Sequence, residues 1–264
     1  HKKKFGQNFL TDQKEVLRKI LEVSAVNEND TVLEIGPGEG ALTALLLDTA
    51  KKVVTVEIDR DLEKILRKKF DGNPKYTLVM NDVLETDLKE YVEAGTKVVA
   101  NIPYYITSPI INKLIENRDV IDEIYIMVQK EVADRMNAKP STKDYGALSV
   151  AVQYYCDTEI VAKAPRHMFV PQPNVDSIVI GLHVRDEKKY VVDNEDIFFK
   201  TVKASFGQRR KTLLNSLGGL GFLSKDQIRE ALQAANIDEK RRGETLSIDE
   251  FANLSNEINK FSSK

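Results

Sequence analysis

The sequence predicts an α/β fold with a mostly parallel sheet, followed by a small all-helical domain at the carboxyl end. Between residue 31 and about residue 127, short β-branched runs alternate with stretches of helical periodicity. This rhythm is typical of strand–helix units whose parallel sheet carries helices on both faces. After Val184, the charged run 185–189 is followed by helical patterns only. We therefore expect one domain over residues 1–185 and a second over residues 186–264.

Six apolar runs are expected to form strands, the last of them closing the sheet. They are residues 31–35, 52–58, 76–80, 97–100, 123–128 and 177–184. Helices are expected between them, including one over residues 145–155 and one capped by Thr11. Ser108 and Pro109 fit an N-cap followed by a proline in the first helical turn. In the tail, Ser224 and Ser247 each begin a capping box.

Composition indicates a soluble globular protein. The chain has 264 residues, of which 42% are hydrophobic and 30% charged, which allows one large domain and one smaller one. Cys156 is the only cysteine, so we expect a buried thiol in a reducing compartment. The amino end lacks the pattern of a signal peptide and no apolar run approaches the roughly 20 residues of a membrane span. We expect a cytoplasmic monomer without membrane contact. Because residue 1 is not methionine, a missing short leader stays open.

Charge is unevenly distributed along the chain. The net charge of −2 argues on average against nucleic-acid binding. However, lysines crowd the amino end, and no acid occurs between Ile197 and Lys225. We expect RNA phosphates to bind at two basic patches, although each can equally be an ordinary solvated face. The patches are Lys2, Lys3 and Lys4, and Arg209, Arg210 and Lys211.

A glycine-rich turn follows the first predicted strand. The sequence Glu34-Ile-Gly36-Pro-Gly38-Glu-Gly40 precedes a helical stretch, and its glycines allow a ligand to approach the backbone. Such a turn is a weak signal by itself, and a role of Gly40 in helix–strand packing alone stays open. The next strand ends in Glu57, which is suited to accept hydrogen bonds from both hydroxyls of a ribose.

Two further strand ends extend this pattern. The third strand leads to Asp82 and Val83, where a carboxylate meets the adenine amine of the same ligand, and the fourth leads to Asn101. Ligands of open α/β sheets bind at such carboxyl ends. The spacing GxGxG favours S-adenosylmethionine over NAD. We expect no metal ion and no catalytic base, because an activated methyl group needs chiefly alignment and exclusion of water.

The corner Asn101-Ile102-Pro103-Tyr104 is suited to hold an exocyclic amine, with adenine N6 as the expected target. The side-chain oxygen of Asn101 and a main-chain carbonyl held by the proline can accept both N–H protons and favour a pyramidal nitrogen. Tyr104 is placed to stack on the ring.

These residues resemble the ribosomal RNA adenine N6-dimethyltransferases, and within them most of all the bacterial small-subunit (16S) branch. Six motifs in order carry the resemblance, over nearly the whole chain. They are residues 5–10, 34–38, 101–104, 169–177, 206–212 and 242–247. The resemblance implies a sheet that ends in an antiparallel strand and a helical RNA-binding or ribosome-binding domain. It also implies S-adenosylmethionine as cofactor and dimethylation of two adjacent adenosines near the 3′ end of 16S rRNA during small-subunit biogenesis.

The resemblance also assigns roles to matching residues. Phe169 would cover the target face opposite Tyr104, although a core phenylalanine is an equal alternative. Many relatives carry Leu where Ile102 stands, which keeps the carbonyl, and Asn where Tyr105 stands, which leaves the pocket rim uncertain. Residues implied to border the cofactor are Gln7, Asn8, Leu10, Gly36, Gly38, Glu57, Asp82, Val83 and Asn101.

Three alternatives stay open. The 23S rRNA methyltransferases of the macrolide-resistance type share the first four motifs, but the motifs at 209–212 and 242–247 favour the small-subunit branch. A non-catalytic RNA-binding assembly factor would share the scaffold, but the glycine turn and the corner at Asn101 are intact. An NAD oxidoreductase is the least favoured, and a titration with both cofactors would exclude it.

Overall fold

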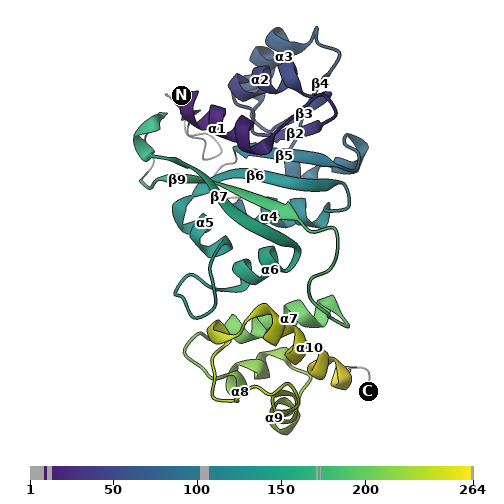
Figure 1. The fold of residues 1–264 in the computed structure, drawn as a ribbon, viewed down its shortest axis with the longest axis vertical. Coiled ribbons are helices and arrows are strands. Elements are labelled where there is room, and N and C mark those ends of the chain that lie inside the picture. Colours follow the sequence, from purple (N-terminus) through teal and green to yellow (C-terminus); the bar gives the residue numbers. More distant parts are fainter. Residues whose placement is uncertain (1–8, 11–13, 102–106, 171, 173, 263–264) are drawn as a thin grey trace. The chain divides into compact units, whose positions relative to one another are not determined.

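The computed structural model describes residues 9–10, 14–101, 107–170, 172 and 174–262 (Figure 1). The chain divides into two compact units. The first comprises His1–Ala133 and Asp157–Val184, and the second comprises Asp134–Cys156 and Arg185–Lys264. The chain passes from the first unit to the second after Val184, where the sequence analysis places the domain boundary. It differs from the expected division in that Asp134–Cys156 also belongs to the second unit, against whose core this segment packs.

The first unit is built on a seven-stranded sheet in the order β4-β3-β2-β5-β6-β9-β7. From β4 to β6 neighbouring strands pair in parallel, whereas β9 pairs antiparallel with β6. The mostly parallel sheet with a closing antiparallel strand is thereby confirmed. The bounds are β2 (Thr31–Ile35), β3 (Lys52–Glu57), β4 (Tyr76–Met80), β5 (Thr96–Asn101), β6 (Ile121–Gln129), β7 (Cys156–Ala164) and β9 (Ser177–Val184).

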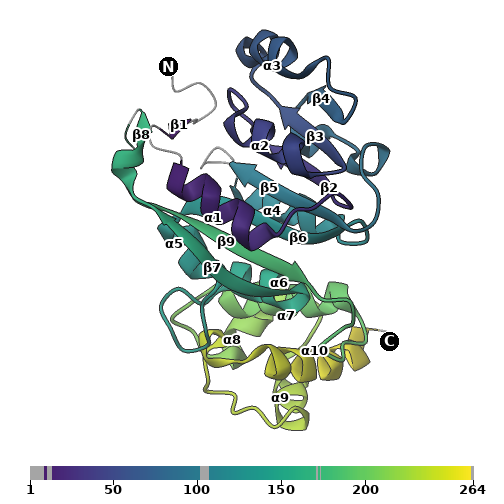
Figure 2. The same ribbon diagram turned by 45° about the horizontal axis from the view of Figure 1, so that its top comes forward.

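The sheet is covered by helices on both faces, and alternation along the strands separates the two layers. One layer joins Val32, Val53, Val99 and Tyr125 to the apolar sides of α1, α2 and α3. The intervening strand residues point to the other face, where α4 contacts β6. Figure 2 shows α1 in front of the sheet and α4 behind it. The bounds are α1 (Lys14–Ser24), α2 (Ala41–Thr49), α3 (Glu63–Phe70), α4 (Thr107–Glu116) and α5 (Lys130–Met136).

Two elements depart from the sequence prediction. Helix α4 begins at Thr107, so Ser108 lies within its first turn and is not the N-cap, while Pro109 has the expected first-turn position. Strand β7 was not predicted, because its charged residues Asp157, Glu159 and Lys163 hide the apolar positions of an edge strand. Thr11, the expected cap of α1, lies outside the described residues.

A second, two-stranded sheet joins distant parts of the first unit. Strand β1 (Phe9–Leu10) pairs antiparallel with β8 (Phe169–Val170). In this register Leu10 lies opposite Phe169. The backbones of two motifs that are about 160 residues apart in the sequence thus run side by side.

The second unit is helical. Both predicted capping boxes are confirmed, because Ser224 and Gln227, and likewise Ser247 and Glu250, exchange backbone-to-side-chain hydrogen bonds. The bounds are α6 (Ala147–Tyr155), α7 (Glu195–Phe206), α8 (Leu213–Ser216), η7 (Leu217–Leu220), α9 (Lys225–Ala234), η8 (Gly243–Thr245) and α10 (Ile248–Ser262).

The core of this unit explains why residues 134–156 belong to it. Tyr145 and Tyr154 are buried in the same cluster as Phe198 of α7 and Phe251 of α10. The Tyr145 hydroxyl donates a 2.6 Å hydrogen bond to the carbonyl of Leu246. The segment therefore contributes apolar side chains and a buried polar tie to the helical core.

Two expectations from composition can be compared with the structure. Cys156 is buried, as expected. Over the described part of the chain, none of the helices has the length and apolar character that a membrane crossing requires.

Candidate cofactor and substrate site

Four neighbouring strands bring the predicted site residues to one edge of the sheet. Strands β4, β3, β2 and β5 lie in that order and run parallel, so their carboxyl ends share this edge. Backbone hydrogen bonds continue beyond the strands, from Gly36 N to Val56 O and from Asn81 N to Glu57 O, both at 3.0 Å. Gly36, Glu57, Asp82 and Asn101 therefore occupy four adjacent strand ends, as the sequence predicts.

The glycine turn requires glycine at its first position for two reasons. Gly36 has φ 70°, in the left-handed region that L side chains rarely adopt. A Cβ atom at this position would also collide with the main-chain oxygen of Asn101. The turn between β2 and α2 thus packs directly against the end of β5. Gly38, with φ 60°, continues the same left-handed path.

Gly40 has a packing role. Its φ is 92°, and a Cβ atom there would lie 2.5 Å from Cε2 of Phe70 and 3.3 Å from Cδ2 of Leu66. Both contacts come from α3, so the last glycine of the turn permits close approach of the start of α2 to α3. This is the structural alternative foreseen for Gly40, with a helix instead of a strand as the partner.

Glu57 ends β3 beneath the glycine turn and is 1% exposed. Its Oε1 accepts a hydrogen bond from Gly38 N at 3.4 Å, and its Oε2 accepts one from Asp59 N at 2.9 Å. Burial raises the pKa of Glu57, and the backbone N–H donors oppose that rise. Each carboxylate oxygen can accept a further hydrogen bond, so the group retains acceptors for a diol.

Glu34 is a buried acid of this site that the sequence reading did not single out. It is the last residue but one of the buried strand β2, and its Oε1 accepts a hydrogen bond from the Thr43 hydroxyl of α2. Burial raises the pKa of Glu34 to about 7, the Thr43 hydrogen bond opposes the rise, and the charge of Glu57 adds to it. The available signal was a glutamate inside an otherwise apolar strand.

Asp82 and Val83 follow β4. The Oδ1 atom of Asp82 accepts a hydrogen bond from Leu84 N at 3.0 Å and caps a short 3-10 turn. Within the described residues, its Oδ2 atom receives no hydrogen bond and is available to a ligand donor. Val83 is 4% exposed, so its side chain belongs to the core and only its main chain remains for ligand contact.

Asn101 is the last residue of β5 and is exposed. Its main chain is fixed by the pairing of β5 with β2 and β6 and by the contact with Gly36. An exposed asparagine therefore ends β5 at the point where its main chain packs against the glycine turn.

For several predicted site residues, the structure describes either the backbone alone or nothing. Leu10 and Phe169 are placed only as backbone, in β1 and β8. Other predicted site residues lie outside the described part of the chain. These are Gln7, Asn8, Ile102, Tyr104, Lys2, Lys3 and Lys4.

The basic residues of the second unit fall into two groups. The guanidinium of Arg209 donates to Glu244 Oε2 at 3.1 Å and to the carbonyl of Tyr145 at 3.0 Å. Arg210 and Lys211 are exposed, and no ion pair holds either of them within the described residues. The geometry thus gives Arg209 a structural task, while Arg210 and Lys211 are available to a partner.

The two tail motifs, residues 206–212 and 242–247, pack against each other around Arg209. A Cβ atom on Gly243 would lie 2.6 Å from the carbonyl oxygen of Ser205, at the end of α7. The backbone N–H of Leu213 donates a 2.7 Å hydrogen bond to the carbonyl of Arg241. The segments 206–212 and 242–247 therefore form one packed junction in which Arg209 and Glu244 are paired.

The strand order, the antiparallel strand and the glycine turn followed by an acid at the next strand end define the fold of the S-adenosylmethionine-dependent methyltransferases. The family described as "Ribosomal RNA adenine dimethylase" matches residues 1–260. The chain belongs to this family.

Similar proteins span almost the whole chain. The "Ribosomal RNA small subunit methyltransferase A" of Clostridioides difficile (strain 630) is 63% identical over 268 residues, covering 99% of this chain and 92% of that protein. The protein of the same name from Fusobacterium nucleatum is 56% identical over 255 residues, covering 96% of each.

Two solved structures share the fold over the full length. A dimethyladenosine transferase from Plasmodium falciparum has a TM-score of 0.82 and 29% identity, covering 96% of this chain and 98% of its own. The 23S rRNA methyltransferase ErmE has a TM-score of 0.70 and 30% identity, covering 96% and 100%. Both units of this chain thus have counterparts in enzymes that carry these two names.

Proposed function

We propose that the chain transfers methyl groups from S-adenosylmethionine to N6 of two adjacent adenosines near the 3′ end of 16S rRNA, giving N6,N6-dimethyladenosine during small-subunit biogenesis. The family membership and the names of the relatives support this proposal. One observation carries it at the level of chemistry: Asn101 is exposed, and its main-chain oxygen packs against Gly36 of the glycine turn. An acceptor for an amine thus adjoins a cofactor turn.

The residues present fit S-adenosylmethionine. The left-handed glycines form a cradle that a side chain would fill at Gly36, and Glu57 offers carboxylate acceptors for ribose hydroxyls. Asp82 Oδ2 can accept from the adenine amine. When bound, this cofactor supplies a sulfonium methyl group that is already activated. The protein therefore needs to position and shield the reactants more than to move protons.

The amine to be methylated needs acceptors. Its lone pair is delocalised into the purine ring, and hydrogen bonds from its N–H groups to Asn101 Oδ1 and to the carbonyl of Ile102 favour a pyramidal nitrogen. Tyr104 and Phe169 are proposed to stack on the two faces of the base. The second transfer requires that the same acceptors tolerate one methyl group, so monomethylated adenosine stays a substrate.

The remaining residues are proposed to bind RNA and the ribosomal particle. Arg210 and Lys211 are exposed cations that can contact phosphates, with Lys2, Lys3, Lys4 and Arg209 as the other members of the predicted set. We place this binding function in the carboxyl-terminal domain, residues 186–264, and the transfer in residues 1–185. We further expect a cytoplasmic monomer, since the substrate particle is assembled there.

The test is methyl transfer to purified substrates. Unmethylated 30S subunits and 23S rRNA are each incubated with the full chain and labelled S-adenosylmethionine. We expect four methyl groups per 30S subunit and almost none on 23S rRNA. Clear preference for 23S rRNA would favour the alternative that the similarity to ErmE keeps open. Binding without transfer would favour a non-catalytic assembly factor.

A further inference from the structure

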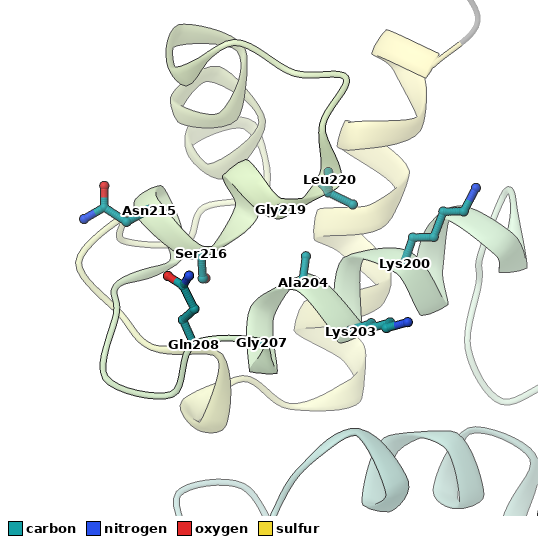
Figure 3. Close-up of a pocket in the computed structure, with 9 residues that line it drawn as sticks. All are labelled: Lys200, Lys203, Ala204, Gly207, Gln208, Asn215, Ser216, Gly219 and Leu220. Carbon is teal, nitrogen blue, oxygen red and sulfur yellow. The ribbon is translucent and has the colours of Figure 1, made fainter. Parts of the chain in front are cut away.

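The second unit contains a pocket of about 500 Å³ that the proposed methyl transfer does not use. It lies between α7, the turn that follows it, and the segment formed by α8 and η7 (Figure 3). Lys200 and Lys203 line it from α7, and Gln208, Asn215 and Ser216 line it from the other two segments. Figure 3 shows the two lysines on one side of the pocket and the three amide and hydroxyl side chains on the other.

Ser216 points to a ligand. The residue is 4% exposed, and within the described residues its Oγ is a buried polar atom without a hydrogen-bond partner. The buried hydroxyls of Thr201 and Ser205 in the same unit instead donate to main-chain carbonyls, at 2.7 and 2.8 Å. A buried hydroxyl without a partner is costly, and each such group in a native protein needs an explanation. In Figure 3 Ser216 lies on the same side of the pocket as Gln208 and Asn215.

The charge of the lining selects an anion. Lys200 forms a 2.9 Å ion pair with Asp196, whereas Lys203 has no ion-pair partner in the described part of the chain. The pocket lies within the acid-free stretch Ile197–Lys225, and none of its lining residues is acidic. A cation on the rim and no carboxylate in the lining suit a phosphate group.

The volume exceeds what a phosphate alone needs and lies in the range of small-molecule sites. Part of the wall is Gly219, whose φ is not in the left-handed region. A Cβ atom there would lie 3.8 Å from Cβ of Ala204, an ordinary contact. Packing therefore does not demand glycine, and the backbone at this position carries no side chain that would take up space in the pocket.

We propose that this pocket holds one unstacked nucleotide of the RNA, with its phosphate at Lys203 and Lys200 and its base or ribose at Ser216, Asn215 and Gln208. The inference rests on the proposed function, since it takes RNA as the ligand. Sequence-specific recognition of RNA usually uses such unpaired nucleotides, whose edges can be hydrogen-bonded. The pocket would supply a contact to the particle that is separate from the methyl-transfer site.

The experiment compares pocket variants with matched controls in the full chain. Lys203→Ala is paired with Lys225→Ala, an exposed lysine of the same acid-free stretch outside the pocket. Gly219→Leu, which fills the pocket, is paired with Gly218→Leu, where a Cβ atom meets nothing within 4 Å. Binding to unmethylated 30S subunits and to a short single-stranded RNA is measured at constant salt. We expect about tenfold weaker binding for Lys203→Ala and Gly219→Leu, and less than about twofold change for the controls.

Ser216→Ala separates a ligand contact from a structural role. Because the hydroxyl has no partner inside the protein, its removal is expected to leave the melting temperature unchanged or higher while RNA binding weakens several-fold. A lower melting temperature would make Ser216 a structural residue and overturn the proposal. Pocket variants that bind RNA as well as their controls would also overturn it.

Two further measurements distinguish RNA from free nucleotide as the ligand and separate the pocket proposal from the proposed methyl transfer. Adenosine monophosphate is titrated alone, and binding as tight as that of the RNA would replace the proposal by a site for free nucleotides. Methylation of 30S subunits by the pocket variants is expected to show a raised KM with kcat retained at saturation. If the wild-type chain does not methylate 30S subunits, the proposed function fails, but the comparison of RNA binding between variants and controls still decides the pocket.

Discussion

Asn101 is the residue on which the proposed chemistry most depends. Asn101→Ala removes the side-chain acceptor without changing the main chain that packs against Gly36. We expect methyl transfer to fall at least about 100-fold, the usual cost of losing one oriented hydrogen-bonding group at a reacting centre. Binding of S-adenosylmethionine and of the 30S subunit should change little. Single-turnover transfer and a cofactor titration measure the two effects.

Asn29→Ala is the control for this substitution, since Asn29 is an exposed asparagine in the turn before β2, at the opposite edge of the sheet. It should leave transfer unchanged. If Asn101→Ala transfers methyl groups at the wild-type rate, the amide has no role in the reaction.

Gly36 is proposed to link cofactor binding to the position of Asn101. In Gly36→Ala the added Cβ atom is strained by φ 70° and collides with the Asn101 carbonyl. We expect a loss of about 1–3 kcal/mol in the free energy of unfolding, together with loss of cofactor affinity and of transfer. Chemical denaturation and a cofactor titration test this. Gly72→Ala is the control, because its Cβ atom meets nothing within 4 Å, and its stability should stay within about 0.5 kcal/mol of the wild type.

Glu34 makes stability depend on pH. Its pKa is raised from 4.5 to about 7 by burial, so the folded protein holds a proton that the unfolded chain releases. The stabilisation from this proton is complete below about pH 4.5 and is lost as the pH rises to about 7. The shift corresponds to about 3 kcal/mol.

Glu34→Gln should remove this dependence, since glutamine keeps an oxygen for the Thr43 hydroxyl but has no proton to lose. Urea unfolding at pH 5 and pH 8 measures it. The pH-dependent change in the free energy of unfolding should differ between wild type and variant by up to about 3 kcal/mol. An identical pH dependence in the two proteins would show that Glu34 titrates normally.

At the scale of elements, the tail motifs serve packing, and we propose that they also serve binding. Arg209 ties Glu244 and the carbonyl of Tyr145 together, whereas Arg210 is exposed beside it. Arg209→Ala should therefore lower the free energy of unfolding by about 1 kcal/mol, with allowance for its partial exposure. Arg210→Ala should leave stability unchanged and reduce the salt slope of 30S binding by about one. Thermal unfolding and binding at several salt concentrations separate the two residues. Equal stability loss in both variants would contradict this division of tasks.

The strands that carry the site were predictable from the sequence. Runs such as Thr31–Ile35 are buried throughout and bounded by turn residues, so composition alone marks them. The glycine turn, Glu57, Asp82 and Asn101 follow these runs directly, and parallel pairing then places them at one edge. Strand β7 was not predicted because one face of this edge strand is charged. The role of Glu34 was not predicted because a single acid in a strand does not reveal its burial or its Thr43 partner.

At the scale of the molecule, local sequence patterns could not predict that residues 134–156 belong to the second unit. Its cause is long-range packing of Tyr145 and Tyr154 with α7 and α10. A chain that ends at Val184 would leave these aromatic side chains without their partners. We expect fragment 1–184 to aggregate and to bind a hydrophobic dye, in contrast to the full chain. Size-exclusion chromatography with dye fluorescence tests this, and a monodisperse fragment without dye binding would contradict it.

The contact of Gly36 with the Asn101 carbonyl has a wider consequence. If Gly36 and Asn101 have the proposed roles, the contact between these two backbone segments sets the spacing between methyl donor and acceptor, and side-chain substitutions elsewhere cannot change it. Relatives that methylate another RNA would then differ in the residues that contact the nucleic acid, while the distance between donor and acceptor stays the same. Attempts to redirect this enzyme to a new target adenosine should for the same reason leave β2, β5 and the turn between β2 and α2 untouched.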